Sequence, residues 1–376
     1  MIPFNRPYLT GRELTYIAEA AASGVLSGNG AFTTRCQAWL RERLAAPGVL
    51  LTHSCTGALE MAALLADLQP GDEVIMPSFT FVSTANAFVL RGATPVFVDI
   101  RPDTLNLDER LIESAITART RAIVPVHYAG VGCEMDAIME IARRHDLLVI
   151  EDAAQALGST YKGRPLGAIG HLAALSFHET KNVIAGEGGA LVVNDSRFRQ
   201  RAEILWEKGT DRVRFFRGET SKYTWVDVGS SFLPSEITAA FLWAQLEQEP
   251  GINAQRLALW KRYFALTSAT PSLRPPTIPD HCGHNAHLFY VLLAKGFDRV
   301  EVLGAMKARG VNAIFHYVPL HSSPAGLRYG RTATPMTVTD DCSSRLIRLP
   351  LWLGMTPDMP PTVVDALQDV LAAQPR

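Results

Sequence analysis

The 376-residue sequence lacks several features that would place it in a specialised class of protein. Its five cysteines are odd in number, widely scattered and never spaced as Cys-x-x-Cys, which argues against a disulfide framework and favours free thiols in a reducing compartment. The formal net charge of -1 does not favour nucleic acid or an anionic membrane as a partner. No apolar run is long enough to cross a bilayer, and the first residues lack a basic segment followed by an apolar one. We therefore expect a cytoplasmic protein that acts on small molecules.

The composition is typical of a compact globular protein, with 47% hydrophobic and 19% charged residues in a chain long enough for two domains. In the first half, short β-branched segments alternate with helix-like ones, which predicts a mostly parallel sheet covered by helices on both faces. The expected strands are residues 49–52, 73–76, 95–100, 121–126, 147–150, 173–177 and 190–193. The expected helices between them are residues 56–65, 82–90, 111–116 and 135–145.

The alternating pattern ends after a predicted helix at residues 197–207 and a polar, aromatic connection at 212–223. A helical stretch at 234–262 leads to a proline-rich loop at 271–279. The remaining expected elements are strands at 288–293 and 312–316 and helices at 300–309 and 363–372. We predict a large α/β domain at residues 1–249 and a smaller α+β domain at 250–376.

Lys181 is the first candidate for chemistry. It lies between an apolar segment that ends at Phe177 and a glycine cluster at residues 186–189. Desolvation there would lower the pKa of its ammonium group and leave an amine that can form a Schiff base with an aldehyde. A lysine in such a loop is, taken alone, more often exposed to solvent. Residues elsewhere in the chain reverse that balance.

A pyridine aldehyde held by a lysine needs a phosphate anchor, a carboxylate at the ring nitrogen and a group against the ring face. Thr56 and Gly57, at a predicted strand-to-helix turn, would offer amide groups and a hydroxyl to the phosphate. Asp152 follows an apolar strand, and Phe81 could stack on the ring. Each has a structural alternative, because Ser, Thr and Asp often cap helices and most phenylalanines pack in the core.

One short segment contains donor atoms that suit zinc. It is residues 281–287, with His281, Cys282, His284 and His287. These consecutive donors do not have a recognised zinc spacing, and no second group of ligands accompanies them. We therefore expect a histidine-rich connection and no metal.

Four motifs in the same order resemble the DegT/DnrJ/StrS family of pyridoxal-phosphate sugar aminotransferases. They are residues 54–56 (SCT), 151–155 (EDAAQ), 176–181 (SFHETK) and 186–189 (GEGG). The resemblance covers nearly the whole chain and implies the fold type I aminotransferase architecture, with pyridoxal 5'-phosphate as cofactor and pyridoxamine phosphate as its second form. It implies that Lys181 carries the cofactor, Asp152 pairs with the ring nitrogen and Gln155 lies near the ring hydroxyl. The remaining implied contacts are phosphate binding by Thr56, Gly57 and Ser176, and stacking by Phe81.

The resemblance also implies a homodimer, or a dimer of dimers, in which the segment 229–236 of one subunit reaches the phosphate in the other. Many members of the family have an asparagine at the position of Leu233, whose side chain cannot donate a hydrogen bond. Ser230 or Ser231 are the candidates to replace it, and we choose Ser231.

A narrower likeness to one branch of the family is carried by residues 71–92 and 215–218. It implies amino transfer from L-glutamate to C4 of a dTDP-linked 4-keto-6-deoxyhexose, with the galacto epimer as product. Such sugars supply surface polysaccharides, including lipopolysaccharide and enterobacterial common antigen. Polar residues in plausible substrate-binding segments are Arg217, Lys222, Tyr317 and His321.

Several alternatives remain open. A related aminotransferase could form another amino sugar or epimer, and a non-catalytic regulator could keep the fold and the cofactor. Dehydratases on the same scaffold replace the lysine with histidine, so Lys181 argues against that activity. A nicotinamide enzyme is disfavoured because residues 186–189 lack the Gly-x-Gly-x-x-Gly spacing.

Overall fold

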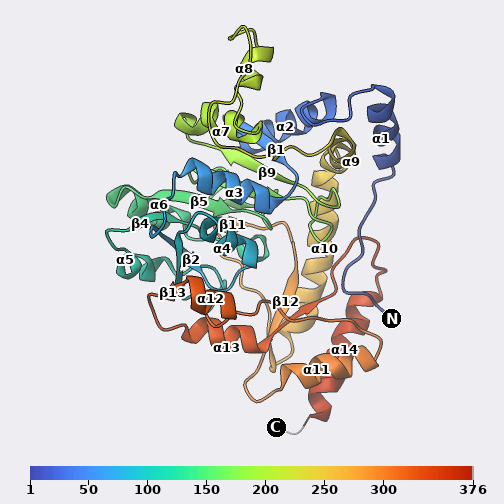
Figure 1. Ribbon diagram of the computed structural model, residues 1–376. Coiled ribbons are helices and arrows are strands. Elements are labelled where there is room, and N and C mark those ends of the chain that lie inside the picture. The colour runs from blue at the N-terminus through green and yellow to red at the C-terminus, as the bar shows by residue number, and fades with distance from the viewer. Residues whose placement is uncertain (375–376) are drawn as a thin grey trace.

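The computed structural model describes residues 1–374, and an eight-stranded sheet forms its centre (Figure 1). The strand order is β1-β9-β8-β5-β4-β2-β3-β13. Within this sheet, β9 is antiparallel to both of its neighbours, whereas the other adjacent pairs are parallel. The bounds are β1 Gly48–Thr52, β2 Glu73–Pro77, β3 Thr94–Val98, β4 Thr120–Ile123, β5 Leu148–Asp152, β8 Leu172–Ser176, β9 Gly189–Val193 and β13 Arg331–Thr332. The predicted mixed, mostly parallel sheet is confirmed.

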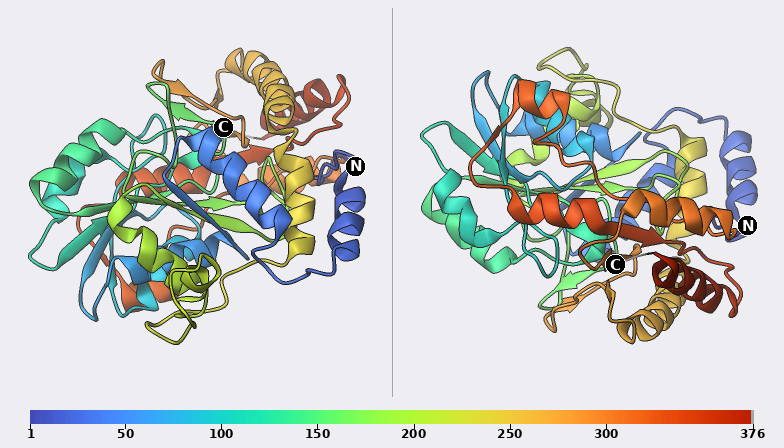
Figure 2. Two further views of the ribbon diagram at one scale, coloured as in Figure 1. Left: turned by 90° about the horizontal axis from the view of Figure 1, so that it is seen from above. Right: turned by 90° about the horizontal axis from the view of Figure 1, so that it is seen from below.

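Helices bury both faces of this sheet, and successive side chains of each strand point to opposite faces. In β2, Ile75 contributes to one core, while Val74 and Met76 contribute to the other. Figure 2 shows helices on both sides of the sheet. The core that contains Ile75 is covered by α1 Glu13–Ala22, α2 Ala31–Leu44, α5 Ile112–Ala115, α6 Met135–Arg144 and α9 Glu236–Leu246. The other is covered by α3 Cys55–Leu65, α4 Val82–Val89 and α7 Arg199–Trp206.

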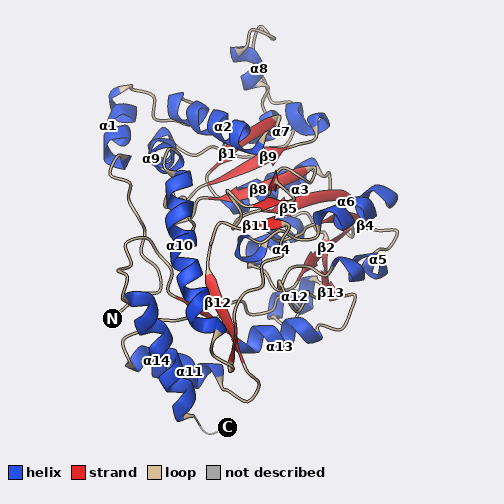
Figure 3. Ribbon diagram, turned by 180° about the vertical axis from the view of Figure 1, so that it is seen from behind, coloured by secondary structure: helices blue, strands red, loops and turns tan. Residues whose placement is uncertain are grey.

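A smaller antiparallel sheet follows in the last third of the chain (Figure 3). It consists of β10 Leu273–Arg274, β12 Phe289–Leu293 and β14 Leu346–Leu349. Its core is closed by α10 Glu249–Ser268, α11 Arg299–Ala308 and α14 Met359–Ala373. Helix α10 belongs to both parts, because Ile252 packs into the large core whereas Trp260 and Tyr263 pack into the small one. The division at residues 249 and 250 therefore stays a prediction.

The remaining α-helices and strands are short. They are β6 Thr160–Tyr161, β7 Arg164–Pro165 and β11 Cys282–Gly283, which form a third sheet, with α8 Arg212–Phe216, α12 Pro324–Tyr329 and α13 Thr337–Arg345. Helix α8 lies in a segment that projects from the body of the molecule (Figure 1). None of the helices in residues 1–374 combines the length and the apolarity that a membrane crossing needs.

Two expectations about individual elements were wrong. The helical stretch at 234–262 is divided between α9 and α10, because the helix breaks at Glu247 and Gln248. The strand expected at 312–316 is not formed, and Ile314 makes only an isolated bridge to Arg348. Ala313 packs into the small core, whereas Phe315 is 47% exposed, so this segment buries too little apolar surface to form a continuous strand there.

A buried carboxylate attaches the C-terminal part of the chain to the edge of the large sheet. Glu73 in β2 accepts hydrogen bonds from Arg331 in β13 at 3.0 and 2.8 Å, from Arg119 at 2.7 Å and from Thr117 at 2.7 Å. The bonds from Arg331 contribute most, and together these contacts outweigh desolvation and lower the pKa of Glu73 from 4.5 to about 2. Ionised Glu73 therefore stabilises the folded state.

We predict that Glu73→Gln lowers the free energy of unfolding at pH 7 by about 2 kcal/mol, a value reduced for solvent screening of the exposed Arg119. Because the pKa is lowered on folding, the contribution of Glu73 is present above pH 4.5 and is lost as the pH falls from 4.5 toward 2. Urea unfolding of the wild type and the variant between pH 7 and pH 3 measures both effects. The exposed Glu19→Gln is the matched control. Equal stabilities of the two variants at pH 7 would contradict the prediction.

Candidate active site

A cavity of about 400 Å³ lies at the carboxyl ends of β5 and β8, the edge at which open parallel sheets bind ligands. The starts of α3 and α4 and the loop between β8 and β9 form its walls on the large sheet. Residues from the last third of the chain line it as well. The cavity brings together seven residues that the sequence singled out, namely Thr56, Phe81, Asp152, Gln155, Ser176, Lys181 and Tyr317.

Lys181 lies in the loop that joins β8 to β9. The loop is fixed by hydrogen bonds from the Lys181 amide to the His178 carbonyl at 2.9 Å and from the Glu179 amide to the Gly186 carbonyl at 2.8 Å. Desolvation lowers the pKa of the Lys181 ammonium group, and Arg348 acts in the same direction, whereas Cys55 and Asp152 oppose the shift. This environment increases the fraction of neutral, nucleophilic amine at a given pH.

Asp152 is the buried last residue of β5, and both of its carboxylate oxygens accept hydrogen bonds. Oδ2 accepts from the Thr84 hydroxyl at 2.7 Å, and Oδ1 accepts from the Ala154 amide at 3.1 Å. The alternative role as the cap of a following helix does not apply, because residues 153–159 form turns. The two donors instead fix the orientation of a carboxylate that lines the cavity.

The start of α3 presents polar groups to the cavity. Ser54 caps the helix by accepting a hydrogen bond from the Gly57 amide at 3.0 Å. The amides of Cys55 and Thr56 lie in the first turn and have no carbonyl acceptor within the helix. The Thr56 hydroxyl donates to Ser83 at 2.8 Å, and Ser176 lines the same cavity from the end of β8. A helix start of this kind suits an anion.

Gly57 does not itself line the cavity. Its amide is occupied by Ser54, and a Cβ atom at this position would lie 2.9 Å from Cε1 of His53. A larger residue here would therefore have to displace the His53 ring.

Two aromatic side chains, those of Phe81 and Tyr317, also line the cavity. Phe81, the residue before α4, is 57% exposed, so it is not a core residue. Its ring centroid lies 6.5 Å from that of Tyr317. Gln155 accepts a hydrogen bond from the Ala129 amide at 2.7 Å and donates to the Tyr317 hydroxyl at 2.9 Å. Gln155 thereby links the large sheet to the aromatic wall.

Besides Gly57, four further predicted residues do not line the cavity of their own chain. Arg217 forms a bidentate ion pair with Glu203 at 2.8 and 2.6 Å. Lys222 and Ser231 are exposed, and Ser231 makes an isolated bridge to Glu207. His321 hydrogen bonds through Nδ1 to the Ser78 hydroxyl at 2.8 Å.

Among the residues that line the cavity, Thr84, His316 and Arg348 were not identified from the sequence, and His287 was considered only as a possible metal ligand. Thr84 lies in the first turn of α4, and its hydroxyl is 2.8 Å from that of Thr80, which precedes the helix. Burial is the main reason that the pKa values of His287 and His316 lie well below the usual range, so both are neutral at pH 7. The sequence signal that could have identified Arg348 is its position as a charged residue between the apolar residues of β14.

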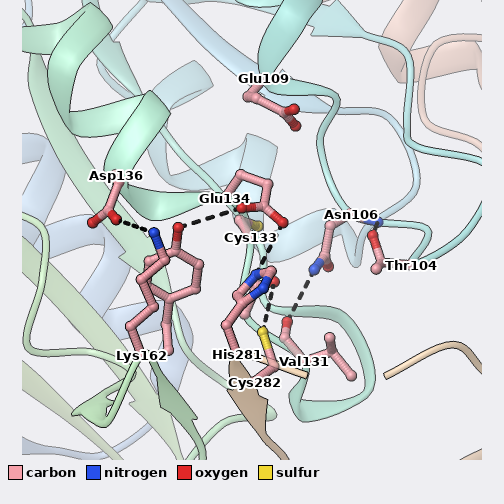
Figure 4. Close-up of polar contacts among 12 residues, drawn as sticks. Thr104, Asn106, Glu109, Val131, Cys133, Glu134, Asp136, Lys162, His281 and Cys282 are labelled. Atoms are coloured by element: carbon pink, nitrogen blue, oxygen red, sulfur yellow. Dashed lines mark hydrogen bonds and ion pairs between the residues drawn. The ribbon is translucent and has the colours of Figure 1, made fainter. Parts of the chain in front are cut away.

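The donors of the histidine-rich segment have separate partners, and Figure 4 shows those of His281 and Cys282. His281 hydrogen bonds to Glu134 at 3.1 Å, and the Cys282 thiol lies 3.8 Å from the Gly132 carbonyl. The ring of His284 instead packs against a tryptophan. Within residues 1–374, no group of three potential metal ligands is present.

Glu151 fixes the loop at residues 167–170 by hydrogen bonds. Its buried carboxylate accepts hydrogen bonds from the amides of Gly167 at 2.8 Å, Ile169 at 2.7 Å and Gly170 at 2.6 Å, and it pairs with His127 at 2.8 Å. Desolvation raises the pKa of Glu151, but the contacts with His127 and the amides outweigh it and lower the pKa overall. An ionised Glu151 therefore fixes β5, and with it Asp152.

Known proteins are similar to this chain over nearly its whole length. The model of the DegT/DnrJ/EryC1/StrS aminotransferase family matches residues 7–368. The spore coat polysaccharide biosynthesis protein SpsC of Bacillus subtilis is 32% identical over 378 residues, covering 98% of this chain and 97% of that protein. The aminotransferase TlmJ from Streptoalloteichus hindustanus superposes with a TM-score of 0.91 at 30% identity, with 99% of each chain covered.

A putative sugar aminotransferase from Streptococcus pneumoniae, Spr1654, is also similar in structure. Its PMP form superposes with a TM-score of 0.91 at 27% identity, with 98% of this chain and 99% of that chain covered. It has been solved in a PLP form as well.

We predict that Glu151→Gln lowers the free energy of unfolding by about 3 kcal/mol, because three amides and His127 lose a charged acceptor and the new amide group faces donors. Hydrogen exchange of the Gly167, Ile169 and Gly170 amides should accelerate more than that of amides elsewhere in the sheet. Urea unfolding and exchange measured by mass spectrometry test the two effects. The control is Glu42→Gln on the exposed surface of α2. Unchanged exchange at these three amides would refute the role of Glu151.

Proposed function

This chain belongs to the DegT/DnrJ/EryC1/StrS aminotransferase family and is a pyridoxal-phosphate-dependent sugar aminotransferase, and we propose a specific reaction for it. The proposed reaction transfers the amino group of L-glutamate to C4 of dTDP-4-dehydro-6-deoxy-D-glucose. Its product is dTDP-4-amino-4,6-dideoxy-D-galactose, a precursor of surface polysaccharide such as lipopolysaccharide or enterobacterial common antigen. The support is the likeness of residues 71–92 and 215–218 to dTDP-4-amino-4,6-dideoxygalactose transaminase.

The observation that carries the proposal for the site is that Lys181 and Asp152 line one cavity with the start of α3. An amine of lowered pKa, an oriented carboxylate and helix-start amides are the three kinds of group that pyridoxal phosphate requires. Their donor and acceptor chemistry fits this cofactor. When bound, pyridoxal phosphate supplies an aldehyde that takes up amino groups and a ring that accepts the electron pair released at a substrate carbon.

We propose that Thr56, Ser176 and the amides at the start of α3 bind the phosphate. In this arrangement Asp152 faces the ring nitrogen, and Thr84 keeps its carboxylate in position. Phe81 covers one ring face, since its exposed side chain is available for stacking.

Lys181 is the proposed proton carrier as well as the point of attachment. Its neutral amine removes the proton from the donor's Cα and then delivers a proton to C4 of the acceptor sugar. Desolvation supports this role, because a lowered pKa of the Lys181 amine increases the fraction of neutral base that can accept a proton.

We propose that the active protein is a homodimer or a dimer of dimers. Ser231 is exposed and does not line its own chain's cavity, so phosphate binding by this residue requires a second copy. The same holds for Arg217 and Lys222 as substrate-binding residues, whereas Tyr317 lines the cavity of its own chain and His321 lies next to Ser78. A cytosolic location stays a prediction.

We predict that Lys181→Ala folds but no longer retains cofactor after borohydride treatment and denaturation, because the amine that forms the covalent bond is absent. Mass spectrometry of the reduced chain measures the attachment. Turnover should fall by several orders of magnitude, since the residue also moves protons. The control is Lys307→Ala, on the exposed surface of α11. Turnover close to that of the wild type would remove Lys181 from the mechanism.

One assay tests the reaction itself. The purified enzyme is incubated with L-glutamate and, separately, with dTDP-linked and UDP-linked 4-keto-6-deoxyhexoses, and NMR assigns the configuration at C4 of the product. The expected product is the dTDP-linked galacto amine. A different epimer or nucleotide preference would replace the proposed substrate with that of another member of the family. Failure of glutamate and other amino acids to change the visible absorption of the cofactor would favour the non-catalytic regulator.

A further inference from the structure

Arg348 is a cation in the middle of an apolar strand. In β14, Ile347 and Leu349 point into the small core, and alternation directs Leu346 and Arg348 to the opposite face. Tyr290 is the residue directly opposite Arg348 on β12. This face of the small sheet borders the cavity, and Arg348 is one of the residues that line it. Placing a guanidinium here costs desolvation energy that an apolar side chain would avoid.

The structure offers Arg348 no anionic partner. Among residues 1–374, no carboxylate oxygen lies within 4.0 Å of its guanidinium nitrogens. Its buried Nε has no hydrogen-bond acceptor. The ring of Phe4 covers one face of the guanidinium, with its centroid 4.7 Å from Cζ. Desolvation lowers the pKa of Arg348, although a guanidinium remains charged at neutral pH.

Neighbouring Arg256 shows what a structural arginine looks like in this protein. Arg256 is also buried, but it donates hydrogen bonds to the carbonyls of Ala286 at 3.1 Å, His287 at 2.7 Å and Leu351 at 3.3 Å. Its donors are therefore committed to the protein. Those of Arg348 are not, although the two groups repel each other electrostatically.

The charges around Arg348 make this wall of the cavity attractive to an anion. Arg348 acts together with burial to keep His287 and His316 neutral, and it contributes to the lowered pKa of Lys181. The buried carboxylate that lines the cavity, Asp152, is already bonded to Thr84 and Ala154. A planar guanidinium with free donors matches a carboxylate in geometry.

We propose that Arg348 binds the α-carboxylate of the amino donor, an assignment that rests on the proposed function. The α-carboxylate is attached to the carbon whose proton Lys181 removes, so it has to lie deep in the cavity near this lysine. The diphosphate of a nucleotide sugar is on the far side of the sugar ring from the reacting C4. Arg348 therefore determines affinity for the amino acid and not for the sugar nucleotide.

The two half-reactions of the holoenzyme separate these roles. In Arg348→Met, the L-glutamate concentration that half-saturates conversion of the pyridoxal form to the pyridoxamine form should rise by roughly 10- to 100-fold. L-Glutamine should show a similar rise if it acts as a donor, because it has the same α-carboxylate. Reaction of the pyridoxamine form with the dTDP-linked 4-keto sugar should stay within about twofold of the wild type. Arg348→Lys should be intermediate, since it keeps the charge but loses the fork.

A binding measurement provides a readout that does not depend on turnover. Calorimetric titration with 2-oxoglutarate, the keto acid product, into the pyridoxal form, with which it cannot transaminate, should show a Kd weakened by a similar factor. The control is Arg309→Met, an exposed arginine after α11 whose loss removes the same charge. Thermal unfolding of all three variants establishes that the comparison is between folded proteins.

The outcomes distinguish the alternatives. A loss confined to the sugar half-reaction would assign Arg348 to the diphosphate and overturn the proposal. Equal losses in both halves, with 2-oxoglutarate binding unchanged, would identify a residue that shapes the cavity and would also overturn it. If the wild type shows no spectral change with any amino acid, the proposed function itself has failed, and with it the basis for this assignment.

Discussion

The alternation of side chains at the end of β5 is the constraint on which the rest of the site depends. Glu151 and Asp152 are consecutive, so one carboxylate points to the loop at residues 167–170 while the other faces the cavity. Two neighbouring acids would repel each other if they shared a pocket, and the strand separates them. The anchored carboxylate keeps the strand end in place, and the second is left free to take part in chemistry.

The fold was largely accessible from the sequence because its elements follow simple periodicities. Buried strands such as 173–177 and 190–193 are continuous apolar runs, and the helices between strands are rich in strong helix formers. The break between α9 and α10 was not predicted, although Pro250 in the first turn of α10 is a residue that marks the start of a new helix. The expected strand at 312–316 depended on pairing that only the tertiary structure decides.

Predictability of the site followed a similar division. Thr56, Asp152, Ser176 and Lys181 come from strand ends and loops of one repeating pattern, so their convergence could be expected. His287, His316 and Arg348 come from the last third of the chain, and no local pattern brings them to the same cavity. The role expected of Ser231 concerns a contact between subunits, which one chain does not contain. Burial of Arg348 without a partner became visible only with the side chains in place.

The pairing of β13 with β3 has a consequence for how the protein is made. β3 leaves the ribosome early, whereas Arg331 and Thr332, which complete the edge beside it, are synthesised much later. Throughout that interval the nascent chain exposes an unpaired, parallel strand edge rich in valine and phenylalanine, which is the kind of surface that associates with other chains. Translation speed and chaperone supply are therefore expected to limit the yield of folded protein before any property of the finished enzyme does.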